Sequence, residues 1–349
     1  MPSFMTNMRL HLSIPCTAGS MTRATESGLD QDIAIYKSMT FAESTKRTYK
    51  SQLTAYLSFC HAMGYRAVPA SSATLHRYAA LLARSLKFTS IKQYISVIRF
   101  LHLEWGLPDP LKENYSLTAL MKGIQRSLSS PIRRKAPITP PLLLHILSRL
   151  DLSKALDSCV WAAALVMFHA MLRRSNVLPS GPTSFDQTKQ LRLMDITVFR
   201  DHLSVYIKWS KTMQFGERPY SIPLYRARNS PLCPVQATVH ARRFSQGAPL
   251  DGPAFVYLHQ SKLKPLTSGT FMQVIRQCLA SSGFEKSQFG THSFRRGGAS
   301  HAFQAGLSVD SIRLIGDWKS NAYTSYVFHS NSTLHSAMKQ IGHSLPTYT

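Results

Sequence analysis

Acidic residues are scarce in this chain of 349 residues. It holds 17 Asp and Glu against 41 Lys and Arg, which gives a formal net charge of +24. The acids form no clustered pair, which argues against metal-dependent nucleases and polymerases, because these enzymes hold Mg²⁺ with grouped carboxylates. A folded protein with such an excess of positive charge typically binds a polyanion, and nucleic acid is the first candidate. The sequence has no long basic amphipathic stretch that would favour a membrane surface.

Other absences narrow the possible chemistry. Five scattered cysteines without a C-x-x-C pair argue against a zinc ribbon or a disulfide scaffold and fit a reducing compartment. The longest apolar run, residues 159–172, is too short to span a bilayer and predicts a buried helix. The N-terminus shows no clear signal peptide. The chain also lacks a phosphate-binding G-x-x-x-x-G-K-[ST] loop, a G-x-G-x-x-G after a strand and a G-x-S-x-G turn. Transfer of a phosphodiester by Arg, Lys, His and a hydroxyl nucleophile, without metal or ATP, remains possible.

Periodicity predicts a mainly α protein with two domains. Residues 1–38 read as a flexible tail, and 39–128 as an all-helical domain whose first helix is capped by Ser44 or Thr45 and ends at Gly64. The Pro-rich basic segment 129–138 predicts a linker. Residues 139–349 predict a mostly helical domain, which begins with a helix at Pro140 capped by Thr139. This domain also contains a small antiparallel sheet of about three strands, with turns at 199–202 and 215–219.

The segment THSFRRGG, residues 291–298, carries concentrated positive charge and no carboxylate. His292 and Arg295 lie three residues apart and therefore share a helix face. This pattern alone is weak evidence. It gains weight from three other segments: HAMLRRSN at 169–176 ends the apolar helix, KWSKTMQFGERP at 208–219 predicts a hairpin, and IGDWKSNAYTSY at 315–326 places a tryptophan eight residues before a tyrosine.

In this order, the motifs resemble those of the tyrosine recombinases, also called the phage integrase family. The resemblance implies a helical SAM-like core-binding domain followed by a catalytic domain. The segment GDWKSNAYTSYV is most similar to recombinases of eukaryotic mobile elements of the DIRS/Ngaro and Crypton kinds, in which Trp stands where many bacterial members have His.

The resemblance also implies a role for each matched residue in site-specific recombination. Arg173 and Arg295 would bind the non-bridging oxygens of the scissile phosphate, with help from His292 and Trp318. Lys211 would protonate the departing 5′ oxygen, and Tyr326 would attack to give a 3′-phosphotyrosyl intermediate. The reaction needs no metal, ATP or other cofactor.

Several alternatives accompany these assignments. Lys208 competes with Lys211, and Tyr323 with Tyr326. Arg173 alternatively caps a helix C-terminus, and Trp318 is alternatively a core aromatic. Arg174 and Arg296 are interpreted as surface or supporting charges, and the adjoining glycines as sites of close helix packing or of backbone approach to DNA. Asn176 occupies a position at which many family members have an acid.

The family clamps duplex DNA between its two domains, which predicts a set of contact residues: Lys46, Arg47, Lys50, Lys92, Gln93, Arg99, Arg133, Arg134 and Lys135. A terminal amphipathic helix at 331–345 is expected to dock on a neighbouring protomer, so that a monomer or dimer becomes a homotetramer on synapsed DNA. The expected location is nuclear if the host is eukaryotic, and otherwise cytoplasmic or in the nucleoid. The alternative functions are an inactive DNA-binding protein derived from a recombinase and a type IB topoisomerase.

Overall fold

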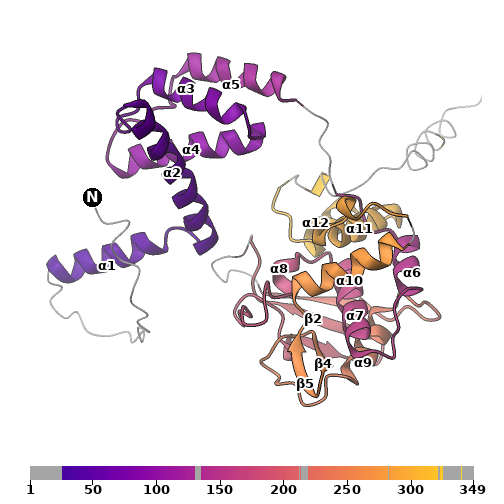
Figure 1. Cartoon of the computed structure of the whole chain (residues 1–349). Helices are drawn as coiled ribbons and strands as arrows, with labels where there is room; N and C mark the ends of the chain where they lie inside the picture. Colours follow the sequence, from indigo (N-terminus) through magenta and orange to yellow (C-terminus); the bar gives the residue numbers. More distant parts are fainter. Residues whose placement is uncertain are drawn as a thin grey trace, which may run out of the picture. The chain divides into compact units, whose positions relative to one another are not determined.

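The chain forms two compact units, Met1–Ile132 and Arg133–Thr349 (Figure 1). The computed structural model describes residues 26–129, 135–211, 213, 219–281, 283–320, 323–324 and 339. The predictions for Arg133, Arg134, Tyr326, the helix at 331–345 and most of the hairpin turn at 215–219 lie outside these residues. None of the described helices is both long and apolar enough to cross a membrane.

Unit 1 is helical throughout its described elements, which are α1 (Glu26–Met39), α2 (Glu43–Met63), α3 (Ser72–Ala83), α4 (Phe88–Glu104) and α5 (Tyr115–Ser127). Its core is built from the apolar faces of α2 to α5. The rings of Tyr56 and Tyr78 meet edge to face at 5.2 Å between centroids, and Leu75, Ile91 and Ile98 are fully buried around them. Gly64 ends α2 in the left-handed conformation, as predicted.

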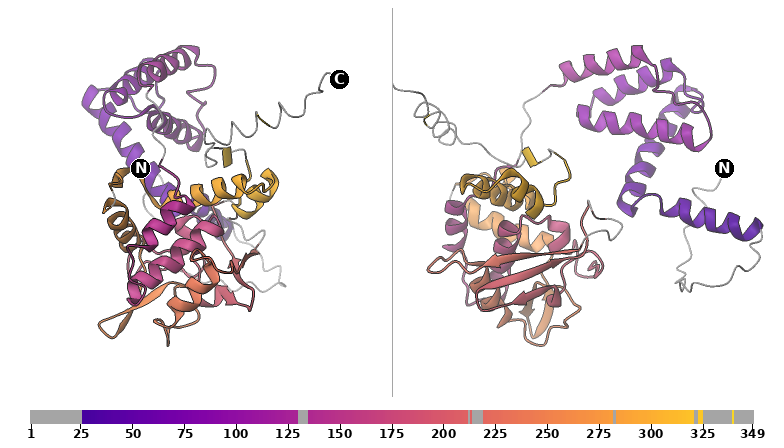
Figure 2. Two further views of the ribbon diagram at one scale, coloured as in Figure 1. Left: turned by 90° about the vertical axis from the view of Figure 1, so that its right-hand side faces the viewer. Right: turned by 180° about the vertical axis from the view of Figure 1, so that it is seen from behind.

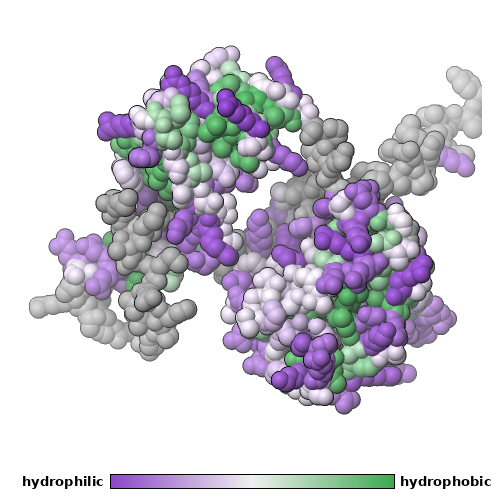
Figure 3. All heavy atoms as spheres, viewed as in Figure 1, coloured by the Kyte–Doolittle hydropathy of each residue, from purple (hydrophilic) through white to green (hydrophobic). Residues whose placement is uncertain are grey.

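Two predictions for unit 1 differ from the structure. Residue Ala42, and neither Ser44 nor Thr45, stands at the N-cap of α2, and its side chain makes no capping hydrogen bond. The segment read as a tail contains α1, which buries none of its residues. Its apolar side chains point to solvent, with Leu29, Ile33, Tyr36 and Met39 at least half exposed. Figure 3 shows hydrophobic patches on both units, among the hydrophilic side chains that cover much of the visible surface.

The described residues of unit 2 form helices and two small sheets. Its helices are α6 (Pro140–Leu147), α7 (Ala155–His169), α8 (Arg174–Val177), α9 (Pro234–Arg242), α10 (Ser268–Ala280), α11 (Thr291–Gln304) and α12 (Val309–Ile315). Helices α11 and α12 lie toward one end of the unit and the hairpin of β4 (Val256–His259) and β5 (Lys262–Pro265) toward the other (Figures 1 and 2). Pro140 begins α6 as expected, but Thr139 makes no side-chain capping bond.

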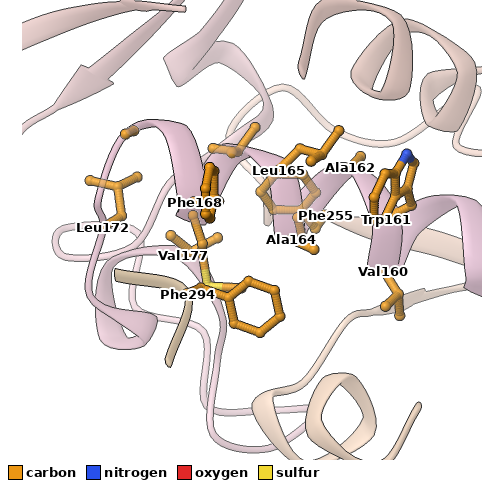
Figure 4. Close-up of a cluster of buried hydrophobic side chains, with 14 of the residues drawn as sticks. Val160, Trp161, Ala162, Ala164, Leu165, Phe168, Leu172, Val177, Phe255 and Phe294 are labelled. Carbon is orange, nitrogen blue, oxygen red and sulfur yellow. The ribbon is translucent and has the colours of Figure 1, made fainter. Parts of the chain in front are cut away.

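Helix α7 forms the centre of unit 2. All of its residues from 158 to 168 are buried, as expected for a helix that is apolar on every side. Figure 4 shows Leu165 and Phe168 of α7 in the same buried cluster as Phe294 of α11. The helix ends at His169, three residues before the end of the apolar run, because Met171 takes a left-handed conformation with φ 48°. This turn leads the chain into Arg173, the N-cap of α8.

Within the described part of unit 2, three antiparallel strands form the predicted sheet, in the order β1 (Ile196–Val198), β2 (His202–Ile207) and β3 (Tyr220–Tyr225). The turn at 199–202 joins β1 to β2 as predicted, with Val198 opposite Leu203. Tyr220 pairs with Ile207, so β3 begins where β2 leads toward Lys211. The separate β4–β5 hairpin was not predicted, because four-residue strands carry too little alternation to be recognised.

Candidate phosphate-binding site

Two adjacent glycines allow α11 to touch its neighbours through its backbone. A Cβ atom on Gly297 would lie 1.8 Å from the carbonyl oxygen of Ile138, and one on Gly298 would lie 2.0 Å from that of Phe168. Any side chain would push α11 away from α7. The expectation that these glycines permit close packing is confirmed, and the packing fixes Arg295 relative to the end of α7.

Arg295 is 2% exposed, and main-chain carbonyl groups answer its charge. Its Nη1 donates to the carbonyl of Met171 and its Nη2 to that of Gly316. The guanidinium carbon lies 3.9 Å from the centroid of the Trp318 ring. Such a desolvated cation–π contact typically contributes about 2 kcal/mol. Arg295 is therefore held by the turn after α7, the turn after α12 and an aromatic face.

Trp318 is both a core residue and a wall of the site. It is 6% exposed and packs with Met171, Ala299 and Ile312 in a small cluster apart from the main core. A Cβ atom on Gly316 would lie 1.8 Å from Cζ3 of the indole, so only glycine lets the ring fold back here. Tyr323, the alternative nucleophile, packs against the same cluster.

Arg173 lies beside a carboxylate that the sequence analysis overlooked. Its Nη1 is 3.5 Å from Oδ2 of Asp317, and its Nη2 is 3.5 Å from the main-chain oxygen of the same residue. Ser210 donates a hydrogen bond to the same carboxylate. Asp317 stands between Gly316 and Trp318, inside the segment that the sequence singles out for its tryptophan. The available signal was the placement of one of only 17 acids inside a motif.

His292 is exposed at the start of α11, and its pKa is lowered. Desolvation by the surrounding protein is the largest cause of this shift, and three positive charges add to it, those of Arg295, Arg173 and Arg174. The imidazole is therefore neutral at pH 7 and able to donate one hydrogen bond. The structure thus brings three of the predicted residues together with Trp318: Arg173, His292 and Arg295. Arg174 donates to the Ser268 hydroxyl at 2.9 Å, which supports the fold beside them.

The two candidate lysines have different surroundings. Lys208 lies 2.6 Å from a carboxylate oxygen of Asp195, which is almost fully buried and is also bound by Arg192 at 2.8 Å. Desolvation lowers the pKa of Lys208, and Asp195 partly counters this effect. Lys211 is exposed, directly after Ser210 in the turn that follows β2. Lys208 is thus held in a buried ion pair, and the exposed Lys211 stays the predicted acid.

Two further polar groups support this end of the sheet. Asn176 donates from its amide to the carbonyl of Trp209 at 2.6 Å, so here the residue acts as a donor where an acid could not. Burial raises the pKa of Tyr220 to about 12, and the charges of Asp317, Arg295 and Arg173 also act on it. The hydroxyl group of Tyr220 thus lies near the arginines. The alternating pattern of the strand gives no reason to predict Tyr220 as a site residue.

Arg296 is 9% exposed, so the prediction that it is a surface charge is wrong. Its contacts agree with the alternative prediction, a charge that supports the fold. Its guanidinium donates to the carbonyl of Lys135, and the ammonium of Lys135 donates to the carbonyl of Ser287. The amide of Ala136 adds a bond of 2.8 Å to Gln288. These contacts tie the start of unit 2 to α11 and to the loop before it.

The predicted DNA contacts of unit 1 lie on α2 and α4. The side chains of Arg47, Lys50, Lys92 and Gln93 are exposed. Lys46 is paired with Glu43 at 2.5 Å and Arg99 with Asp109 at 2.6 Å, but exposed pairs of this kind contribute only about 1 kcal/mol or less and exchange readily with a phosphate. A hollow of about 430 Å³ runs from Arg47 on α2 to Tyr94 on α4. Arg47 is the basic residue among those that line this hollow.

Comparisons with known proteins bear on the fold. No protein-family model matches the chain. The chain is 22% identical over 278 residues to an integrase/recombinase, a xerD homolog of Selenomonas ruminantium, with 78% of this chain and 77% of that protein covered.

Solved structures agree over most of the chain. Lambda integrase bound to a core site matches with TM-score 0.58 and 16% identity over 88% of this chain and 96% of that one. The Tn1549 transposon integrase with transposon right-end DNA matches with TM-score 0.58 and 15% identity, over 89% of this chain and 98% of that one. XerH site-specific recombinase bound to its difH substrate matches with TM-score 0.55 and 12% identity, over 91% of this chain and 85% of that one. The chain has the tyrosine recombinase fold, as the sequence predicted.

Proposed function

We propose that this protein is a site-specific DNA recombinase of the tyrosine recombinase kind. The observation that carries the proposal is the convergence of Arg173, Arg295 and His292 at the N-terminal end of α11, beside the turn that bears Lys211. Two guanidinium groups and a neutral imidazole donor suit the two non-bridging oxygens of a phosphodiester. Trp318 shields Arg295 from one side and keeps its position fixed.

In the proposed reaction the Tyr326 hydroxyl loses its proton to solvent, and its oxygen attacks the scissile phosphorus. Arg173 and Arg295 neutralise the charge that grows on the phosphoryl oxygens. The bond to the 5′ oxygen breaks, and Lys211 gives that oxygen its proton. A 5′-hydroxyl from a second DNA strand then gives its proton to Lys211 and attacks the 3′-phosphotyrosyl bond. Tyr326 leaves and regains its proton from solvent, so each strand exchange conserves one phosphodiester.

The similar proteins support this function. The matched structures of lambda integrase, the Tn1549 integrase and XerH are complexes with DNA, and one of these enzymes belongs to a transposon. On this basis we propose that the chain binds duplex DNA and serves a mobile element. The finer resemblance to DIRS/Ngaro and Crypton recombinases, a nuclear location in a eukaryotic host and a tetramer on synapsed DNA are proposed with it.

A nicked suicide substrate tests the proposed chemistry. Loss of the short fragment beside the nick prevents religation, so an active recombinase accumulates as a covalent protein–DNA adduct. We expect this adduct with the full chain in the presence of EDTA and without ATP, and we expect none with Tyr326→Phe. Tyr323→Phe is the matched control and should retain the adduct. DNA binding by the wild-type chain without an adduct would favour the inactive DNA-binding alternative.

A further inference from the structure

Asp317 lies between two parts of the proposed site. Its side chain is 15% exposed, and its carboxylate contacts Arg173 on one side and the Ser210 hydroxyl on the other. Arg173 and Ser210 lie 37 positions apart, and Asp317 follows Ser210 by 107 positions. A single carboxylate therefore joins the end of the α7 region, the end of the sheet and the turn after α12.

Each contact holds a group that the proposed reaction uses. Both Nη atoms of Arg173 face residue 317, one toward its carboxylate and one toward its main-chain oxygen. Ser210 is 2% exposed and immediately precedes Lys211, and its carbonyl accepts from the amide of Met213 at 3.1 Å. The carboxylate thus restrains the guanidinium of Arg173 and the start of the turn that carries Lys211.

The Asp317 carboxylate lies among several positively charged side chains. Arg173, Arg174 and Arg295 act together on His292, so the site gathers several positive charges before any phosphate arrives. Asn176 brings no negative charge and gives its amide to Trp209. From this arrangement we infer that Asp317 is a positioning residue, which aligns Arg173 with the Lys211 turn for strand cleavage. This inference rests on the proposed function.

The backbone offers a simpler explanation for an Asp at this position. Residue 317 has φ 51°, a left-handed conformation that Gly, Asn and Asp tolerate best. If conformation alone selected Asp317, then Asn would replace it without loss, because Asn keeps both the shape and the backbone preference. If the charge aligns the site, Asn will fold normally and cleave slowly. Asp317→Asn therefore separates the two explanations.

The experiment measures cleavage and binding separately with the full chain. Single-turnover adduct formation on the nicked substrate gives the cleavage rate, and a Tyr326→Phe background gives the Kd without cleavage. We expect Asp317→Asn to slow cleavage between about tenfold and a hundredfold, the range for one charge-assisted hydrogen bond, while the Kd stays within about threefold of its original value. Asp310→Asn, an exposed acid in the neighbouring helix α12, is the matched control and should cleave at the wild-type rate.

A double-mutant cycle tests the route through Ser210. Ser210→Ala alone should slow cleavage, and it should add nothing in an Asp317→Gly background, because the carboxylate that Ser210 contacts is then gone. Wild-type cleavage by Asp317→Asn, additive effects in the cycle, or a loss found entirely in Kd would each overturn the inference while leaving the recombinase proposal intact. If the wild-type chain forms no Tyr326-dependent adduct, the recombinase proposal fails and this inference fails with it.

Discussion

The contact between α11 and α7 leaves no room for a side chain at residue 298, and this sets the outcome of Gly298→Ala. The new Cβ would lie 2.0 Å from the Phe168 carbonyl oxygen, about 1.4 Å short of ordinary van der Waals contact. The two helices must separate by roughly that amount, since a main-chain carbonyl in a buried helix has no way to rotate aside. Overpacking of this kind costs about 3 kcal/mol, partly offset by about 1 kcal/mol from the better helix propensity of Ala.

The same displacement reaches the proposed site. Arg295 lies on α11 and binds the carbonyl of Met171 just after α7, so separating the helices moves Arg295 relative to Arg173. A misplacement of about 1 Å is enough to slow catalysis roughly a hundredfold. Denaturant unfolding should show a loss of about 2 kcal/mol, and adduct formation should slow by about two orders of magnitude.

Gly123→Ala is the control for Gly298→Ala. Gly123 lies within α5 and has no atom near the position of a new Cβ, so this substitution should be neutral or stabilise the protein by up to about 1 kcal/mol. A Gly298→Ala protein with wild-type stability and wild-type cleavage would refute the argument from backbone contact.

Three more predictions follow from the charges. Because the pKa of His292 is lowered in the free protein and a bound phosphate would raise it, DNA binding should take up a proton and tighten as the pH falls below neutral. Calorimetry in buffers of different ionisation enthalpy should show this uptake, and His292→Gln should abolish it. Asp195→Asn should destabilise the protein by about 3 kcal/mol in denaturant unfolding, because Lys208 and Arg192 lose their buried partner. Desolvation raises the pKa of Asp195, but these two basic groups outweigh it and lower the pKa overall. The stability that the ionised carboxylate contributes is therefore complete above about pH 4 and is lost as the pH falls below it. Lys50→Ala should reduce the slope of log affinity against log salt by about one unit, whereas an unchanged slope would remove Lys50 from the phosphate contacts.

Local patterns predicted the elements whose causes are local. The apolar run at 159–172 predicted α7, and Gly64 marked the end of α2. The three-stranded sheet followed from alternation along β1 to β3. Each of these signals depends on residues that are close together in the sequence.

The remaining features depend on contacts between distant segments. Asp317 meets Arg173 across 144 positions and Ser210 across 107, so nothing near it in the sequence reveals its partners. In the sequence, residues 291–298 carry concentrated positive charge without a carboxylate among them. In the structure, carbonyl groups from two other turns already hold Arg295, and Arg296 is used to fasten Lys135. These interactions exist only once the chain has folded.

Mass spectrometry of the covalent adduct tests the central claim most directly. After nuclease and trypsin digestion, Tyr323 and Tyr326 fall in one peptide between Lys319 and Lys339, and fragmentation assigns the nucleotide remnant to one of them. Our account predicts a 3′-linked nucleotide on Tyr326 alone, formed without metal. A remnant on Tyr323, a 5′ linkage, or a cleaved substrate with no protein attached would contradict it.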